Sequence, residues 1–325
     1  LERVELWKRH SACKGERPPI HIEVGTFAHQ VIAPQMQCED PFARSLEWQM
    51  LLDCVNQEVF DDDMVVPPCF RMGYDTHFRL FGHSIQQDVM RDENGLELGH
   101  KFHHIMSDLE DDFGKILSPT EFGVDKVSNF AKKERIEDIF GDILPVQLVS
   151  NCLCAVPTQQ VVHLMGLEKM IFSICDYPEL FHTMMDRIAD SYISYFRHLE
   201  EEGVLLHNHG FEWLGQGSLC FFPEEEKAGP AKTTEMWGFM DSQETVGMSP
   251  DMFHEFIFPA YQKIAQYFGR LSYGCCEPVH TFWEDIKTLP NLKKVSISPW
   301  CNEEFMADQL RGTDTIYLRK PHPNF

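Results

Sequence analysis

Short β-rich runs alternate with long amphipathic segments along the chain, and this alternation limits the fold more than any other feature of the sequence. The expected strands are residues 20–24, 64–66, 146–149, 204–207, 236–240, 271–273, 295–298 and 315–318. Strands that alternate with helical segments are typical of repeated βα units around a parallel sheet. Eight such units predict an α/β fold of the (β/α)8 TIM barrel type, whose chemistry takes place where strands run into helices.

Two of the expected helices carry clear start signals. Ser249 and Pro250 supply an N-cap and a proline at the first helical position, and Asp176 and Pro178 bracket the start of the other helix. Apolar residues then recur at helical spacing in both segments, so we expect both helices to face the core.

We expect a single domain over residues 1–325, with an inserted hairpin or lid at about 74–120, where the pattern is less regular. The chain stops just past the eighth expected strand. We therefore expect the helix that would close the barrel to be missing, or to be replaced by the N-terminal helix.

The composition of the chain argues against several classes of binding partner. A formal net charge of −23 repels phosphate backbones and polyanionic substrates, so we expect no nucleic-acid partner. Eleven scattered cysteines, an odd number, indicate reduced thiols and hence a cytoplasmic protein. No apolar run approaches the ~20 residues of a membrane-spanning helix, and the first residues lack the apolar middle of a signal peptide. We expect no membrane partner.

Two adjacent cysteines follow the sixth expected strand. The alternation of a strand predicts that Tyr273, Cys275 and Glu277 share one face, while Cys276 packs behind the sheet as a small apolar side chain. Adjacent cysteines need a strained ring to bond, so we expect no disulfide between Cys275 and Cys276.

The same region resembles a known family. The motifs are YGCCEPVH at 273–280, LPNLKKVSISPW at 289–300 and YLRKPHP at 317–323, with weaker similarity at 237–244, 249–253, 37–41 and 61–66. They resemble the uroporphyrinogen decarboxylase superfamily, in particular its branch related to corrinoid-dependent methyltransferases. The resemblance covers most of the chain and implies a (β/α)8 barrel.

Within that superfamily, methylcobamide:thiol methyltransferases hold zinc with a His-x-Cys motif at the end of the sixth strand and with a later cysteine. Here Tyr273 stands at the histidine position, Cys275 matches the first cysteine, and no cysteine follows Cys301. The resemblance thus implies zinc only if other side chains join Cys275. The candidate ligands are Asp241, Glu244, His207, His209 and His322.

True decarboxylases of this superfamily carry an arginine-rich segment after the first strand, which pairs with the carboxylates of the tetrapyrrole. The corresponding segment here, 17–27, contains Glu23 and no arginine after Arg17. Together with the net charge, this argues against uroporphyrinogen as the substrate.

Other side chains at expected strand ends suit catalysis or binding. Asp241 and Glu244 end the fifth strand and suit proton transfer; a plain helix N-cap role for Asp241 or Ser242 is the competing explanation. His207 and His209 suit a metal or a pair of proton-transfer groups, or they are simply hydrogen-bonding loop residues. Cys152 and Cys154 fit buried packing better than a reactive pair. The remaining candidates are Glu277 and Glu23 for catalysis, and Tyr273, Trp237, Trp300, Arg319, Lys320 and Asn151 for substrate binding.

These features predict a zinc-dependent methyltransferase that moves a methyl group between a small methylated or methoxylated substrate, or a thiol, and a corrinoid protein. Zinc would act as a Lewis acid at the barrel mouth, and the corrinoid would be supplied by the partner. One alternative is a decarboxylase-like lyase on a smaller carboxylic acid, with Asp241 or Glu23 moving the proton and Arg319 or Lys320 gripping a carboxylate. Another is a non-catalytic protein that binds a corrinoid or an aromatic ligand.

Overall fold

The computed structural model describes residues 1–92, 97–223 and 227–322. The chain forms two compact units. The first unit comprises Leu1–Asp75, Asp125–Asn151 and His207–Ala228, and the second comprises Thr76–Val124, Cys152–Leu206 and Gly229–Phe325.

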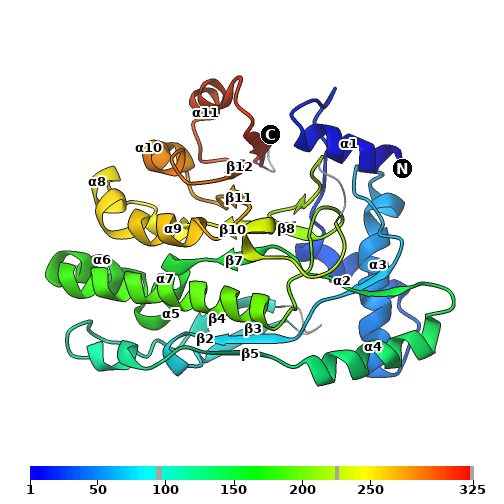
Figure 1. The fold of residues 1–325 in the computed structure, drawn as a ribbon, viewed down its shortest axis with the longest axis horizontal. Coiled ribbons are helices and arrows are strands. Elements are labelled where there is room, and N and C mark those ends of the chain that lie inside the picture. The colour runs from blue at the N-terminus through cyan, green and yellow to red at the C-terminus, as the bar shows by residue number, and fades with distance from the viewer. Residues whose placement is uncertain (93–96, 224–226, 323–325) are drawn as a thin grey trace. The chain divides into compact units, whose positions relative to one another are not determined.

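A parallel sheet is the centre of the second unit (Figure 1). In the described part of the chain it has five strands in the order β13-β12-β11-β10-β7, and each pair of neighbours runs parallel. The strands are β7 (Leu153–Ala155), β10 (Trp237–Met240), β11 (Arg270–Tyr273), β12 (Leu292–Ile297) and β13 (Ile316–Arg319). The sheet order follows the chain order, so the second unit is built from consecutive βα units. The prediction of an α/β fold with a parallel sheet is confirmed.

Helices connect these strands. They are α5 (Pro157–Met165), α6 (Leu167–Asp176), α7 (Pro178–Glu201), α8 (Pro250–Met252), α9 (Phe258–Ala265), α10 (Trp283–Ile286) and α11 (Glu303–Leu310). A π-helical turn, η7 (Phe253–Ile257), joins α8 to α9. Short 3₁₀ turns are η3 (Leu80–Gly82), η4 (Phe113–Leu117), η5 (Thr233–Glu235), η6 (Gln243–Thr245) and η8 (Val279–Phe282).

Both predicted helix starts are confirmed. Ser249 Oγ accepts a hydrogen bond from Met252 N at 3.2 Å, which caps α8, and Pro178 is the first residue of α7. The apolar face of α7 packs against α9, and Phe181 and Ile188 on this face are fully buried.

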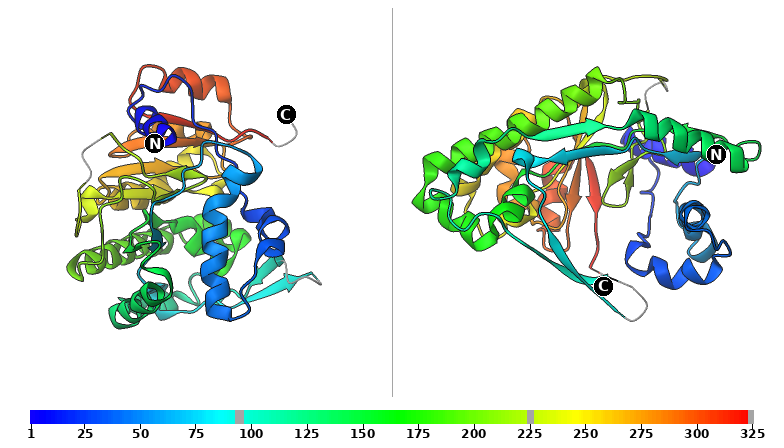
Figure 2. Two further views of the ribbon diagram at one scale, coloured as in Figure 1. Left: turned by 90° about the vertical axis from the view of Figure 1, so that its right-hand side faces the viewer. Right: turned by 90° about the horizontal axis from the view of Figure 1, so that it is seen from below.

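Two antiparallel pairs complete the second unit. Strand β2 (Thr76–Arg79) pairs with β5 (Glu121–Val124), and β3 (Gln87–Arg91) pairs with β4 (Glu97–Phe102), as Figure 2 shows. The β3–β4 pair is a hairpin within the range 74–120, for which the sequence predicts a hairpin or lid; residues 93–96 of that range lie outside the described residues.

In the described residues, the first unit consists of helices and two small sheets. Its helices are α1 (Glu2–Ser11), α2 (Ala28–Val31), α3 (Pro41–Val59) and α4 (Lys126–Phe140), with the 3₁₀ turns η1 (Gly25–Phe27) and η2 (Ala33–Gln35). Strand β1 (Phe70–Met72) runs parallel to β6 (Val146–Leu148), and β8 (Trp213–Gly215) runs antiparallel to β9 (Ser218–Leu219). Leu46 of α3 and Ile136 of α4 pack with Phe70 and Val146 in one apolar cluster.

Three of the eight strand predictions are wrong. Residues 20–24 and 64–66 are not strands, because their backbone N–H groups bind carboxylates instead of a neighbouring strand: Ile20 N donates to Asp63 Oδ2, and Ile22 N donates to Asp62 Oδ2, both at 2.8 Å. In 204–207, only Leu206 forms an isolated bridge, to Pro230. The expected strands at 146–149, 236–240, 271–273, 295–298 and 315–318 correspond to β6, β10, β11, β12 and β13.

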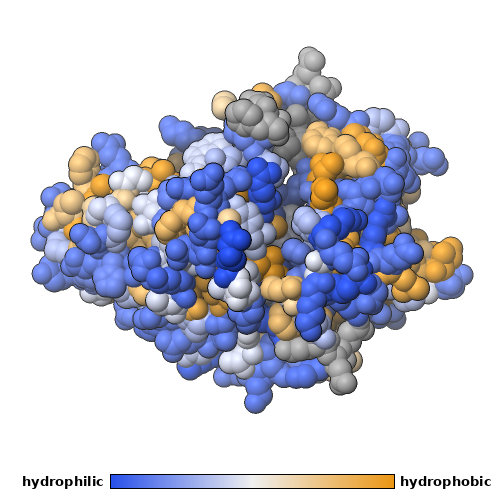
Figure 3. All heavy atoms as spheres, turned by 90° about the horizontal axis from the view of Figure 1, so that it is seen from above, coloured by the Kyte–Doolittle hydropathy of each residue, from blue (hydrophilic) through white to orange (hydrophobic). Residues whose placement is uncertain are grey.

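Polar residues cover most of the face drawn in Figure 3, and apolar residues form separate patches on it. Among the helices of the described residues, none combines the length and the apolar character that crossing a membrane requires.

Gly238 in β10 provides a test of this packing. A Cβ atom at position 238 would lie 2.2 Å from Cγ of Phe268, a fully buried side chain. We expect Gly238→Ala to lower the free energy of unfolding by about 1–3 kcal/mol because the ring has to move within a filled core. Gly114→Ala is the control, since nothing lies within 4 Å of its Cβ position. Urea denaturation measures both, and equal losses in the two variants would contradict the packing described.

Candidate active site

Three carboxylic acids lie at the carboxyl end of the parallel sheet. Asp241 follows β10 directly, Glu244 lies in η6, and Glu277 lies in the loop after β11. The side chains of Asp241 and Glu277 are buried, and Glu244 is half-buried. The carboxyl ends of parallel strands meet at one edge of a sheet, so the fold itself concentrates negative charge there.

Glu277 ties neighbouring loops together. Its carboxylate accepts hydrogen bonds from the backbone N–H of Ser242 at 2.9 Å and from that of Cys275 at 2.8 Å. Its own carbonyl oxygen accepts a bond from Ser298 Oγ at 3.1 Å. Glu277 thus links the segments that follow β10, β11 and β12, and its side chain acts as a positioning group.

A hydroxyl network holds the backbone of Asp241. Tyr261 of α9 donates its hydroxyl hydrogen to the carbonyl oxygen of Asp241 at 2.6 Å, and its oxygen lies 2.9 Å from Thr158 Oγ1. Thr158 in turn donates to Glu244 Oε2 at 2.8 Å. The main chain of Asp241 is therefore fixed by residues from two helices.

The side-chain carboxyl group of Asp241 is less completely hydrogen-bonded than its backbone. Its Oδ1 atom is buried and has no hydrogen-bond partner in the described part of the chain. Burial raises the pKa of Asp241 to about 8, and the neighbouring charges of Glu277 and Glu244 act in the same direction, whereas Lys320 and the backbone N–H of Gln243 oppose them. Burial also raises the pKa of Glu244. Asp241 accordingly holds its proton near neutral pH and can donate it.

The thiol of Cys275 lies at the same end of the sheet. Burial raises the pKa of Cys275 despite the nearby charge of Lys320, so the thiol stays protonated. Lys320 Nζ donates to the carbonyl oxygen of Cys275 at 3.1 Å, and Ser296 Oγ donates to the same oxygen at 3.2 Å. These contacts place the cation that follows β13 beside the segment that follows β11.

The prediction that Cys276 packs behind the sheet is wrong, because Cys276 is exposed. Strand β11 ends at Tyr273, and Gly274 adopts a positive φ of 100°, which interrupts the alternation of faces before either cysteine. The two sulfur atoms lie 3.5 Å apart and both cysteines are free, as expected.

Other predicted site residues of the second unit lie elsewhere. Trp237 and Tyr273 are fully buried in the core: Trp237 is the first residue of β10, at the other end of the strand from Asp241, and the Tyr273 hydroxyl lies 2.6 Å from Ser242 Oγ. Trp300 is exposed and its ring stacks on His322 with centroids 5.8 Å apart. Arg319 is exposed and pairs with Glu303 at 3.0 Å. Of the two predicted cations, Lys320 is the one that contacts the acidic end of the sheet.

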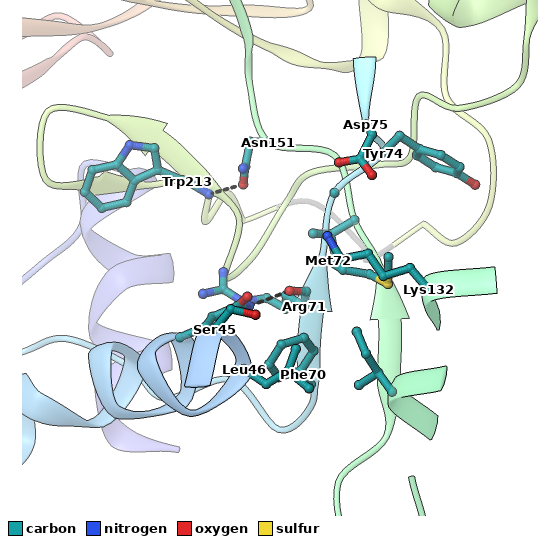
Figure 4. Close-up of a pocket in the computed structure, with 14 residues that line it drawn as sticks. Ser45, Leu46, Phe70, Arg71, Met72, Tyr74, Asp75, Lys132, Asn151 and Trp213 are labelled. Carbon is teal, nitrogen blue, oxygen red and sulfur yellow. Dashed lines mark hydrogen bonds between the residues drawn. The ribbon is translucent and has the colours of Figure 1, made fainter. Parts of the chain in front are cut away.

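Four predicted residues belong to the first unit. His207 and His209 lie with their rings 5.6 Å apart. Glu23 is exposed and lines a cavity of about 560 Å³. Asn151 lines a second cavity of the same unit, shown in Figure 4.

The residues near Cys275 do not fit a zinc site as they are arranged. The Glu277 carboxylate already binds two backbone N–H groups. Among the described residues, no three His, Cys, Asp or Glu side chains are grouped as metal ligands.

Sequence reasoning missed Thr158, Tyr261 and Ser298, which support the acidic residues, and it considered Ser242 only as a possible helix N-cap. Tyr261 belongs to the apolar stripe of α9 and resembles any buried aromatic residue in the sequence. Thr158 follows Pro157 at the start of α5, where a threonine is common. Neither gives a signal before the fold brings it to Asp241.

The pKa of Asp241 predicts how stability depends on pH. The folded state holds a proton on Asp241 up to about pH 8, whereas the unfolded state releases it near its ordinary pKa of ~3.9. Between these values the folded state binds more protons, so the free energy of unfolding falls as pH rises through this window and levels off above it. We expect wild type to lose more stability than Asp241→Asn, by on the order of a few kcal/mol, between about pH 5 and about pH 9.

Urea denaturation at both pH values measures this difference. Asp308→Asn is the control, because Asp308 is exposed on α11 and should follow wild type. Identical pH profiles for wild type and Asp241→Asn would show that Asp241 has no raised pKa.

Substitution of Glu277 tests its positioning role. We expect Glu277→Gln to cost about 1.5–3 kcal/mol in the free energy of unfolding, because the amide can accept only one of the two backbone N–H bonds and leaves a buried donor unpaired. The control is Glu303→Gln, since the Glu303 carboxylate is partly exposed and pairs with the exposed Arg319 at 3.0 Å. Thermal or urea denaturation that finds the same small change in both would contradict this role.

Comparison with known proteins adds little about activity. No family model matches the chain, and no curated protein matches it. A methyltransferase from Methanosarcina mazei is structurally similar, with 13% sequence identity and a TM-score of 0.49 over 97% of this chain and 81% of that one. A likeness at this level identifies neither activity nor substrate.

Proposed function

We propose that the chain is an enzyme in which protonated Asp241 acts as a general acid. The observation that carries this proposal is the Asp241 carboxyl group itself, which is buried, has a pKa of about 8 and has an oxygen with no hydrogen-bond partner in the described residues. A carboxylic acid kept neutral near pH 7 can donate a proton to a developing negative charge.

We further propose that the reaction is transfer of a methyl group from a small methylated or methoxylated substrate to a corrinoid protein. The methyl–oxygen bond breaks, and Asp241 gives its proton to the oxygen that leaves, so the substrate departs as a neutral alcohol or phenol. The corrinoid supplied by the partner protein would accept the methyl group. The Asp241 carboxylate that remains takes up a proton from solvent before the next turnover.

Two features support this reaction class. The motifs at 273–280 and 289–300 resemble corrinoid-dependent methyltransferases. The first contains Glu277, whose charge acts on Asp241, and the second contains strand β12, the next strand of the same sheet after β11. The consecutive βα units of the second unit are also those of a (β/α)8 barrel, which we propose as the complete architecture.

Asp241→Asn tests the general acid. We expect a loss of ~10²–10⁴-fold in turnover, the usual contribution of general acid catalysis, because the amide has no transferable proton. The assay is formation of methylcobalamin from reduced free cobalamin and a panel of methoxylated aromatic compounds, followed by visible absorption. Asp308→Asn should keep wild-type turnover. Wild-type turnover in Asp241→Asn would contradict the proposal.

The pH profile gives a second readout. Activity should fall as pH rises above about 8, because Asp241 then loses the proton that it donates. A profile that stays level to about pH 10 would contradict the assignment.

A carboxy-lyase is the second candidate, and the position of Lys320 favours it. Lys320 lies beside both Cys275 and Asp241, so it could hold a substrate carboxylate while Asp241 protonates the carbanion left by carbon dioxide. Incubation of the protein with small carboxylic acids in the absence of any corrinoid distinguishes the two, since only the lyase releases carbon dioxide.

Zinc stays a prediction from the resemblance. Elemental analysis of purified wild type beside Cys275→Ser tests it. Zinc in wild type that is lost in the variant would support the ligand role of Cys275, and equal zinc in both would exclude it.

A further inference from the structure

The first unit contains a cavity that the proposed function does not use. It has a volume of about 470 Å³ and opens where β1 and β6 end, a position at which α/β sheets commonly bind ligands. Figure 4 shows its lining, which comes from α3, β1, α4 and the segments around Asn151 and Trp213.

Arg71 of β1 is the first donor in its wall. One guanidinium nitrogen donates to the carbonyl oxygen of Phe211, and another donates to Asp53 Oδ1 at 3.1 Å. The third, Nε, is buried and has no hydrogen-bond partner among the described residues. A buried N–H without an acceptor is costly, so a small shift of the guanidinium group that brings Nε to a ligand oxygen would be favoured.

Lys132 of α4 is a second positive group. It lines the cavity, and in the described part of the chain its ammonium group forms no ion pair and no hydrogen bond. Its neighbour Lys133 differs, because it pairs with Glu137 on the same helix. Figure 4 shows the Lys132 side chain directed toward the middle of the cavity.

Asn151 adds a neutral donor. Its Oδ1 accepts a hydrogen bond from Trp213 N at 2.9 Å, which fixes the side chain and leaves Nδ2 without an acceptor in the residues that the structure describes. The amide orientation follows from that bond, since Trp213 N can only donate.

The charge and the remaining lining define the ligand. Arg71 is already paired with Asp53 at 3.1 Å, and the Asp75 carboxylate accepts a bond from Asn129 Nδ2 at 3.0 Å. Lys132 is therefore the lining cation that has no carboxylate partner among the described residues, and it offers an anion a positive charge in a chain with a net charge of −23. Its other walls are apolar and are made by Leu46, Phe70, Met72, Ile136 and Val149.

We propose that this cavity binds a small organic carboxylate with an apolar body. The carboxylate would accept bonds from Arg71 Nε, Lys132 Nζ and Asn151 Nδ2, and the apolar body would pack on the walls from α3, β1 and α4. Carboxylate bonds to cationic donors are the stronger class of hydrogen bond, and the surrounding apolar surface strengthens them further.

Isothermal titration calorimetry of the full chain with benzoate tests the site, with benzamide as the uncharged ligand of the same shape. We expect benzoate to bind and benzamide to bind at least ~10-fold more weakly, since removal of one charge-assisted hydrogen bond lowers the affinity by about that factor. Equal binding of the two, or no binding of benzoate at millimolar concentration, would overturn the proposal.

Three variants localise the binding. Lys132→Met should weaken benzoate binding ~10-fold, whereas Lys133→Met, the matched change at the adjacent position of α4, should leave it within about 2-fold. Asn151→Asp keeps the oxygen that holds Trp213 but replaces the donor by a negative charge, so it should abolish binding. If Lys132→Met and Lys133→Met weaken binding equally, or if Asn151→Asp binds like wild type, the carboxylate does not occupy this cavity.

This test is independent of turnover. A failure here leaves the role of Asp241 untouched, because binding is measured without a methyl donor or a corrinoid.

Discussion

The buried carboxylate of Glu277 holds the candidate active site in place. It binds the backbone of Ser242 after β10 and of Cys275 after β11, two segments that only the sheet brings side by side. Such bonds favour a charged acceptor, and they stabilise a carboxylate inside the protein. The loops of the site thus depend on one negative charge that is stabilised by main-chain dipoles.

Burial and the negative charge of Glu277 both raise the pKa of the neighbouring Asp241. Asp241 is buried next to Glu277 and Glu244, and a second negative charge in this space is disfavoured. The environment therefore gives the two buried carboxylic acids different roles, because Glu277 is bonded and structural, whereas Asp241 is left protonated and able to react. The same logic assigns acid and base roles to paired carboxylates in many enzymes.

The sequence predicted the second unit better than the first for physical reasons. Strands β10, β11 and β12 are largely buried, and helices separate β10 from β11, β11 from β12 and β12 from β13, so local pattern and final structure agree. Residues 20–24 and 64–66 have similar composition, but Asp62 and Asp63 capture the backbone N–H groups that a strand would have used. This competition for backbone N–H groups is seen only in the folded chain and gives no signal in the local sequence.

The candidate active site was likewise predictable only in part. The position of Asp241 at a strand end is visible in the sequence, but its pKa depends on Glu277, Glu244 and the burial that Tyr261 and Thr158 help to create. The exposure of Cys276 depends on a single backbone angle at Gly274. Arg71 and Lys132 had no signal at all, since an arginine in a short strand and a lysine on a helix are ordinary in isolation.

One side chain lines two cavities of the first unit. Arg71 contributes to the wall of the cavity at the ends of β1 and β6 and to that of the cavity beside Glu23. A ligand in one cavity that rotated the guanidinium group would change the size and the electrostatic potential of both. Such a ligand would then alter the affinity of the other cavity, and the effect would be equal in both directions.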